Sequence, residues 1–526
     1  MVSILNDVLG PIMRGPSSSH TAGSHRIATL AAALLGTRPA SARFVFDASG
    51  SYGQVYREQG ADMAFAAGIL GIDLADERYF SVFEIARDEG VEITFGVEPL
   101  ETADHPNHTV IRLNDTAGSD LEVKARSIGG GAIEITAVGN WPVKLNGDCW
   151  HTLVEVDAAA SYAVEAALGS CGQLSGDIRR QEKEGLCLME ARGFEQLPSS
   201  VRRDLAGLPG VRRVREVPPV GFVRRGEPLF SSGAEMVALA ERRHLSLGRV
   251  AVDYESALLG LPKRTVLAET RRRLEVMRES ARAGLDDRVH GMQLLAPTAS
   301  GILRAEKEGR LALGGPHLRA AARAMAVMHV NAAMGVVCAA PTGGSAGVLA
   351  GVVSAMVDEQ GVDPERAALA LLAAGAIGVI VGSRATFAAE VAGCQVEIGA
   401  AGAMAAAAVV EEAGGTAREA ADAAAISLQN TMGSVCDLVQ GVVEIPCHTR
   451  NAAAASGAFL CADLVLGGYA NPIPLDETID AVYAVGRMMP AELRCTARGG
   501  LAVTPSALEM VRRSSRRHGD EAAKAR

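Results

Sequence analysis

Residues Ala367–Val381 read AALALLAAGAIGVIV, the longest apolar run in the chain. The run is too short and too rich in alanine and glycine for a membrane span. A helix that is apolar on every side is buried inside a larger assembly, so the run predicts a core helix of a large helical domain. Alanine and glycine dominate the chain beyond Pro316, which predicts helices packed closely through small residues.

The composition indicates a folded protein with more than one domain. The chain has 526 residues, 48% of them hydrophobic, and a formal net charge of −10. Single hydrophobic cores stop growing at roughly 250–300 residues, so two or three domains are expected. The acidic balance and an aromatic content of only 4% argue against nucleic-acid binding, which depends on neutralised phosphates or stacked bases.

The cysteines and the first residues predict a cytoplasmic location. Nine cysteines, an odd number spread along the chain, form no disulfide framework, so each is expected to be a thiol, a nucleophile or a metal ligand. The start, MVSILNDVLGPIMRGPSSSH, has an early acidic residue and no basic segment, unlike a signal peptide. We therefore expect a protein of a reducing compartment that does not enter the membrane.

Composition divides the chain into three segments. Residues 1–148 mix short β-rich runs with a few helices and are predicted to form an α+β domain. Residues 151–217 follow the order strand, helix, strand, strand, helix, strand, which resembles the ferredoxin-like ACT domain. Pro218–Pro228 has the composition of a linker, and residues 229–510 are expected to form a large, mainly α-helical domain.

The ACT-like insert carries one departure from that family. An Asp-x-Pro-Gly turn usually follows its first strand, whereas here Asp157 is followed by three alanines. An effector site for an amino acid and a pure dimerisation module both stay open. A homodimer is expected because ACT modules commonly pair edge to edge.

The first candidate site is GPSSSHTAGSHRIA, Gly15–Ala28, in which three serines and a histidine precede a predicted helix. Backbone N–H groups at the helix start, together with the hydroxyls, suit an anion such as a substrate carboxylate. A serine-rich helix cap is the alternative.

The second candidate site is a set of three cysteines, Cys394, Cys436 and Cys447, each beside glycine or proline where a helix is expected to begin or end. Their spacings of 42 and 11 residues fit no zinc-ribbon or ferredoxin pattern. Taken alone, the pattern is typical of buried small apolar residues. The alternative is three converging thiolates that leave a metal one open coordination position for chemistry on a bound hydroxyl.

These motifs resemble the iron–sulfur L-serine dehydratases. GPSSSHTAG is similar to the signature of their β domain. The segments similar to their α domain are APTGGSAGVLAG (Ala340–Gly351), AEVAGCQVEIGAAGAMAAAAVVEEAGGT (Ala389–Thr416), CDLVQGVVEIPCHTRNA (Cys436–Ala452) and ELRCTARGGLAVTP (Glu492–Pro505). The chain is thus identified as β and α domains, roughly residues 1–148 and 229–510, fused around the ACT-like insert.

The resemblance implies a [4Fe–4S] cluster held by Cys394, Cys436 and Cys447. In that family the iron without a protein thiolate takes the substrate's β-hydroxyl while a base removes the α-proton. The enamine product then hydrolyses to a 2-oxo acid and ammonia, and L-serine, which gives pyruvate, is the default substrate. The residues that would bind the substrate are Ser17, Ser18, Ser19, His20, Thr342, Gly343 and Gly344.

Two positions at the expected catalytic centre depart from the family. Gln59 stands where the family usually has the histidine of Gly-His-Gly-Thr-Asp, a leading candidate for its base, and glutamine takes up no proton at neutral pH. His20, His25 or another residue must then remove the proton. Some members end in a cysteine that serves as a temporary fourth ligand, whereas this chain ends in AAKAR. We also name Cys495 as a candidate catalytic residue at this centre. The alternative is that Cys495 is a buried structural cysteine.

Other functions stay open beside serine dehydration. The same cluster chemistry could act on another β-hydroxy amino acid, or on cysteine with loss of sulfide, as in the related cysteine desulfidases. From a different class, the chain could be a non-catalytic sensor whose cluster reports oxygen or iron.

Overall fold

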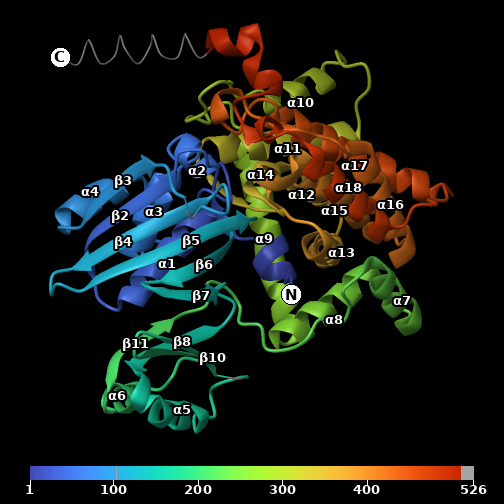
Figure 1. The fold of residues 1–526 in the computed structure, drawn as a ribbon. Coiled ribbons are helices and arrows are strands. Elements are labelled where there is room, and N and C mark those ends of the chain that lie inside the picture. Colours follow the sequence, from blue (N-terminus) through green and yellow to red (C-terminus); the bar gives the residue numbers. More distant parts are fainter. Residues whose placement is uncertain (102, 177, 511–526) are drawn as a thin grey trace.

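A computed structural model of the chain describes residues 1–101, 103–176 and 178–510, so the terminal AAKAR lies outside the described residues. Figure 1 shows three parts: an N-terminal sheet with its helices, a smaller sheet below it and a large group of helices. We call them the sheet domain, the ferredoxin-like module and the helical body. A mixed N-terminal part followed by a helical C-terminal part confirms the predicted multidomain class.

The sheet domain is built on six strands in the order β3-β2-β4-β5-β6-β7. The strands are β2 (Pro39–Asp47), β3 (Glu92–Glu98), β4 (His108–Asp115), β5 (Asp120–Gly129), β6 (Ala132–Val138) and β7 (Trp141–Leu145). Only β2 and β3 run parallel. The helices are α1 (Ala22–Leu35), α2 (Ser51–Val55), α3 (Ala61–Leu70) and α4 (Val82–Asp88). Alternate residues of β5 are buried, and α1 packs on β5 and β6, so one face of the sheet forms the core.

The ferredoxin-like module has the element order that the sequence predicts. Its elements are β8 (Trp150–Asp157), α5 (Ser161–Gly169), β9 (Arg179–Lys183), β10 (Leu186–Gly193), α6 (Ser199–Ala206) and β11 (Val211–Val217). The strands are antiparallel in the order β11-β8-β10-β9, so the first and third strands of the module lie in the middle of the sheet, as in ferredoxin-like folds. Its assignment to the ACT type stays a prediction.

The helical body packs through small residues, as the alanine and glycine content predicts. Its helices are α7 (Gly233–Arg243), α8 (Leu247–Leu259), α9 (Lys263–Gly284), α10 (Ala299–Lys307), α11 (Pro316–Ala332), α12 (Ala346–Asp358), α13 (Pro364–Arg384), α14 (Ala389–Ala392), α15 (Ile398–Glu412), α16 (Ala417–Thr431), α17 (Cys447–Leu466) and α18 (Leu475–Met488). A Cβ on Gly284 would lie 1.8 Å from the Ala326 carbonyl oxygen, so α9 and α11 touch backbone to backbone.

The run Ala367–Val381 lies within α13 and is buried almost throughout, which confirms the predicted core helix. By length and composition alone, α13 and the segment Cys394–Glu412 could each cross a membrane. However, 78% and 89% of their apolar windows are buried inside the protein, a burial typical of core helices.

The first residues of the chain pack into the helical body rather than onto the six-stranded sheet. In the short helix η1 (Ile4–Val8), Ile4 and Val8 occupy the space that side chains on Gly375 and Gly378 of α13 would fill. The buried Glu255 carboxylate on α8 accepts hydrogen bonds from the Ser3 hydroxyl and from the backbone N–H groups of Ile4 and Leu5.

Strand β1 (Ile12–Arg14) follows and pairs antiparallel with β12 (Val336–Cys338) of the helical body. This docking places the serine-rich segment after β1 next to the helical body.

We predict that Glu255→Ala destabilises the full chain by roughly 2–3 kcal/mol, because it leaves the buried N–H groups of Ile4 and Leu5 without an acceptor. Urea unfolding followed by fluorescence measures the change. The matched control is Glu241→Ala, which breaks an exposed pair with Arg418 and should cost less than about 1 kcal/mol. Equal effects of the two substitutions would contradict the assigned role of Glu255.

Candidate active site

Two of the three cysteines predicted as ligands, Cys436 and Cys447, line one cavity, and Cys394 lies beside them. Cys394 begins the short helix η5 (Cys394–Val396), Cys436 lies in β13 (Cys436–Asp437), and Cys447 begins α17. The thiols of Cys394 and Cys436 are hydrogen-bonded neighbours, and Cys447 lines the cavity with Cys436. Segments far apart in sequence thus bring these thiols to one place.

A fourth thiol, that of Cys495, lies at the same cavity. Strand β14 (Arg494–Thr496) runs parallel to β13 with an irregularity in register at this residue, and its thiol neighbours Cys436. Cys495 has a φ of +58°, a left-handed conformation that costs a non-glycine residue roughly 1–2 kcal/mol. Backbone strain of this kind is found at functional sites, and a role of Cys495 at the centre stays a prediction.

The thiols share a low-dielectric environment beside the Arg450 guanidinium. The hydrogen bond with Cys436 and burial raise the pKa of Cys394 well above its usual value, and burial raises that of Cys447. Arg450 opposes this: its Nη1 lies 3.7 Å from the Cys394 sulfur and its Nη2 is 3.0 Å from the Asp437 carboxylate. Buried thiols that need positive charge in order to ionise fit a thiophilic metal centre such as an iron–sulfur cluster.

The serine loop (residues 15–21) and the PTGG loop (residues 341–345) touch each other at the cavity. A Cβ on Gly343 would lie 2.9 Å from the Ser18 backbone nitrogen and 3.1 Å from the Pro16 carbonyl oxygen, so this contact requires glycine. Ser17 and Gly344 line the cavity together with the cysteines.

Further hydrogen bonds hold the PTGG loop against the third cysteine. Asn451 Nδ2 donates to the carbonyl oxygens of Gly344 and Cys447, at 2.9 Å each. Thr342 is buried, caps the turn together with Ser345 and hydrogen-bonds Glu397. Of the seven predicted substrate-binding residues, Ser17 and Gly344 line the cavity, and the other five belong to the same two loops without lining it.

His20 is held rigidly in the serine loop as a neutral ring. It is fully buried, with Nδ1 3.1 Å from the Ser17 hydroxyl and Nε2 3.3 Å from that of Ser51. Burial lowers the pKa of His20 to about 3. Both nitrogens are occupied and the ring is a weak base, so His20 is better suited to positioning Ser17 than to removing a proton. His25 points elsewhere, with its Nε2 2.8 Å from the Ile72 carbonyl oxygen.

Gln59 lines the cavity with an unsatisfied acceptor. Its Nε2 donates to the Gly441 carbonyl oxygen at 3.0 Å, and because a carbonyl only accepts, this contact fixes the orientation of the amide. The fully buried Gln59 Oε1 then has no hydrogen-bond partner among the described residues. A buried acceptor without a donor costs about 1–3 kcal/mol, so this oxygen is suited to a donor on a bound ligand.

Sequence analysis missed two carboxyl groups, those of Glu390 and Glu397, which line the cavity beside the cysteines. Burial raises the pKa of Glu397 to about 8, with a further contribution from Glu390, and burial also raises the pKa of Glu390. Asn107 Nδ2 donates to Glu390 Oε1 at 3.2 Å, and Ser19 also hydrogen-bonds this carboxyl. Two acids flanking Cys394 in an otherwise apolar stretch were the available signal.

The carboxylate of Glu397 and the thiols of Cys394 and Cys436 have ligand atoms within 4.8 Å of one another, a spacing that can hold a metal. The remaining cysteines lie away from the cavity, and all nine are free thiols. Cys338 is buried in the core of the helical body.

Comparison with known proteins covers both halves of the chain. Residues 178–502 match the family described as serine dehydratase alpha chain. The probable L-serine dehydratase alpha chain of Bacillus subtilis (strain 168) is 38% identical over 285 residues, 54% of this chain and 95% of that protein. The probable beta chain of the same organism is 34% identical over 215 residues, 40% of this chain and 96% of its own length. L-serine dehydratase 1 of Escherichia coli (strain K12) is 39% identical over 183 residues, 34% of this chain and 40% of that protein.

Proposed function

Because this chain belongs to the serine dehydratase family, with alpha-chain and beta-chain parts in one polypeptide, we propose that it eliminates water from L-serine to give pyruvate and ammonia. One observation carries the proposal. One cavity is lined by Cys436, Cys447 and Cys495, by Glu390, Glu397 and Gln59, and by Ser17 of the serine loop and Gly344 of the PTGG loop.

Cys394, Cys436 and Cys447 would hold a [4Fe–4S] cluster, with the Cys495 thiol beside Cys436. When bound, the cluster supplies a Lewis-acidic iron that makes the substrate's β-hydroxyl a better leaving group. Arg450 would stabilise the thiolates, since its guanidinium already contacts the Cys394 sulfur.

The polar groups around the cavity can orient a small amino acid. The hydroxyl of Ser17 and the backbone of the serine and PTGG loops would bind the α-carboxylate. The α-ammonium group carries only donors, and Gln59 Oε1 is a buried acceptor without a partner among the described residues. We therefore assign Gln59 to the ammonium group, which gives the glutamine a role that needs no proton transfer.

Elimination also needs a base for the α-proton, and Glu390 is suited to that role. It lines the cavity, Asn107 and Ser19 orient it, and burial raises its pKa, which strengthens the carboxylate as a base. In this step the Cα–H bond breaks, the proton passes to the Glu390 carboxylate, and its electron pair forms the C=C bond as hydroxide leaves the β-carbon.

We also propose a cytoplasmic location and a homodimeric assembly for the enzyme. Nine free thiols and buried core helices support a soluble protein of the reducing cytoplasm. A homodimer stays a proposal, and analytical ultracentrifugation of the full chain tests it.

We expect anaerobically purified protein to contain about four irons per chain and to release pyruvate from L-serine, with both lost in Cys436→Ala. Iron and sulfide analysis with a coupled pyruvate assay measures this. Absence of iron after anaerobic reconstitution would overturn the cluster. Turnover of threonine or cysteine but not of serine would assign a different substrate to the enzyme. A bound cluster without turnover of any of the three amino acids would favour a non-catalytic sensor.

Glu390→Gln should lower kcat by roughly 10²–10⁴-fold with iron content unchanged, because the amide accepts no proton. The wild-type rate should fall as pH drops through the pKa of Glu390, which burial places above the usual 4.5, since only the carboxylate acts as a base. Glu411→Gln is the control, a half-buried acid on α15 that accepts hydrogen bonds from the Ser246 hydroxyl and the Gly248 backbone N–H. Full activity of Glu390→Gln would exclude Glu390 as the base.

Gln59→Leu should raise KM about 10–100-fold and change kcat less, because the substrate ammonium loses a hydrogen bond to a buried acceptor. Steady-state kinetics of the loaded enzyme measure both constants. Gln54→Leu replaces an exposed glutamine of the same segment and should leave KM unchanged. A lower kcat with an unchanged KM would contradict this role and would indicate that Gln59 interacts with the transition state instead.

A further inference from the structure

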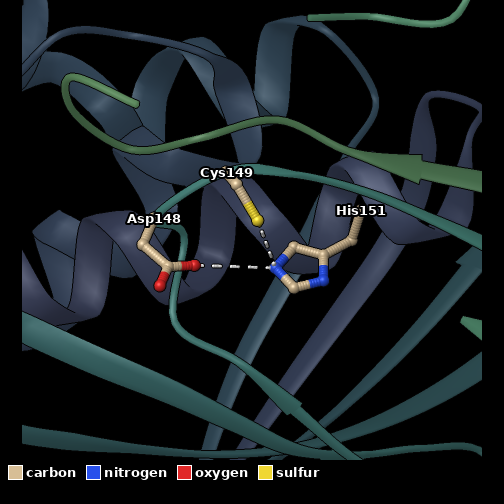
Figure 2. A group of neighbouring side chains, drawn as sticks. All are labelled: Asp148, Cys149 and His151. Carbon is tan, nitrogen blue, oxygen red and sulfur yellow. Dashed lines mark hydrogen bonds and ion pairs between the residues drawn. The ribbon is translucent and has the colours of Figure 1, made fainter. Parts of the chain in front are cut away.

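A second group of metal-ligating side chains lies outside the active site, where the sheet domain joins the ferredoxin-like module. Asp148 and Cys149 precede β8, and His151 lies in this strand. Figure 2 shows the Asp148 carboxylate and the Cys149 sulfur both directed at the same ring nitrogen of His151. The sulfur lies 3.5 Å from His151 Nε2, and Asp148 Oδ1 lies 3.8 Å from it.

These spacings suit a tetrahedral zinc ion. Zinc binds a thiolate at about 2.3 Å and an imidazole nitrogen at about 2.05 Å, so at the tetrahedral angle the sulfur and nitrogen are about 3.5 Å apart. The Cys149 sulfur and His151 Nε2 are separated by 3.5 Å, and all three ligand atoms lie within 4.8 Å of one another. A ring nitrogen has one proton or one lone pair, so without a metal the Asp148 carboxylate and the Cys149 sulfur have to share it.

The other side of the histidine ring has the partner that metal-bound histidines use. His151 Nδ1 lies 3.2 Å from Glu190 Oε1 on β10, and Glu190 is only 2% exposed. A carboxylate on the distal N–H orients the ring and makes the metal-binding nitrogen more basic. His151 is fully buried, so this arrangement is rigid.

We propose that Asp148, Cys149 and His151 bind one zinc ion, with Glu190 positioning His151 and the fourth coordination place open to water. The mixed sulfur, nitrogen and oxygen donors favour zinc over magnesium or calcium, which take oxygen ligands. This proposal stands apart from the serine dehydratase activity and from the cysteine-lined cavity.

The neighbouring contacts give the ion a structural role. The backbone N–H of Arg224, in the linker, donates to the Asp148 carbonyl oxygen at 3.2 Å. The Arg224 guanidinium pairs with Asp148 at 3.5 Å and with Asp7 of η1 at 2.7 Å. An ion bound to Asp148 would therefore fix the point where the sheet domain, the module, the linker and η1 meet.

The test quantifies zinc and iron together in anaerobically purified full chain by plasma mass spectrometry. We expect about one zinc per chain in the wild type, and a more than tenfold loss of zinc in Cys149→Ala at unchanged iron. Cys171→Ala is the control, a thiol of the ferredoxin-like module whose sulfur donates to the Ala167 carbonyl oxygen. Loss of iron together with zinc would place the zinc at the cysteine cavity and overturn the proposal.

A second variant keeps the proposal falsifiable if Cys149→Ala fails to fold. Glu190→Gln should weaken zinc binding by about 10–100-fold in competition with a chelator. Cobalt in place of zinc should give a thiolate-to-cobalt charge-transfer band in the wild type that Glu190→Gln weakens. If the wild type binds no zinc after incubation with zinc ions, the proposed site is wrong. His151 would then be an imidazolium paired with the carboxylates of Asp148 and Glu190.

Discussion

The candidate active-site cavity depends on a contact between two loops from opposite halves of the chain that leaves no room for a side chain. Gly343 meets the Ser18 backbone nitrogen at the distance where a Cβ would clash, so the two loops share one wall. Pairing of β1 with β12 and insertion of η1 against α13 hold the serine loop at this position. The helical body thus determines the geometry of a loop that continues into the sheet domain.

Burial gives the cavity its chemical character. Several thiols and the carboxyls of Glu390 and Glu397 lie out of bulk water, and each would carry negative charge when ionised. Without added positive charge their mutual repulsion and desolvation favour the protonated forms. Arg450 supplies one positive charge, and a cationic cluster core would supply more. The same environment explains why a neutral His20 and an uncharged Gln59 are tolerated as cavity neighbours.

Sequence analysis predicted what short local patterns encode. The apolar run of α13 and the order of strands and helices in the module are local patterns that indicate their own structure. The three cysteines taken alone are typical of buried apolar residues, and only the family resemblance predicts them as ligands. It missed Glu390 because an acid in an alanine-rich stretch is equally typical of a helix end at the surface. The hydrogen bond that Asn107 of the sheet domain donates to this carboxyl joins segments far apart in the sequence. The position of Cys495 depends on an irregular pairing with β13, and the orientation of Gln59 on the Gly441 carbonyl, both contacts between distant segments.

The insertion of η1 into the helical body has a consequence for how this enzyme is assembled. The two Bacillus subtilis relatives are named as separate alpha and beta chains, so in a two-chain arrangement an equivalent segment would have to cross between polypeptides. In one chain the same docking is intramolecular, with an effective concentration on the order of millimolar set by the connecting residues. Completion of the active site then becomes independent of how dilute the protein is, and every copy carries its two halves in equal amounts.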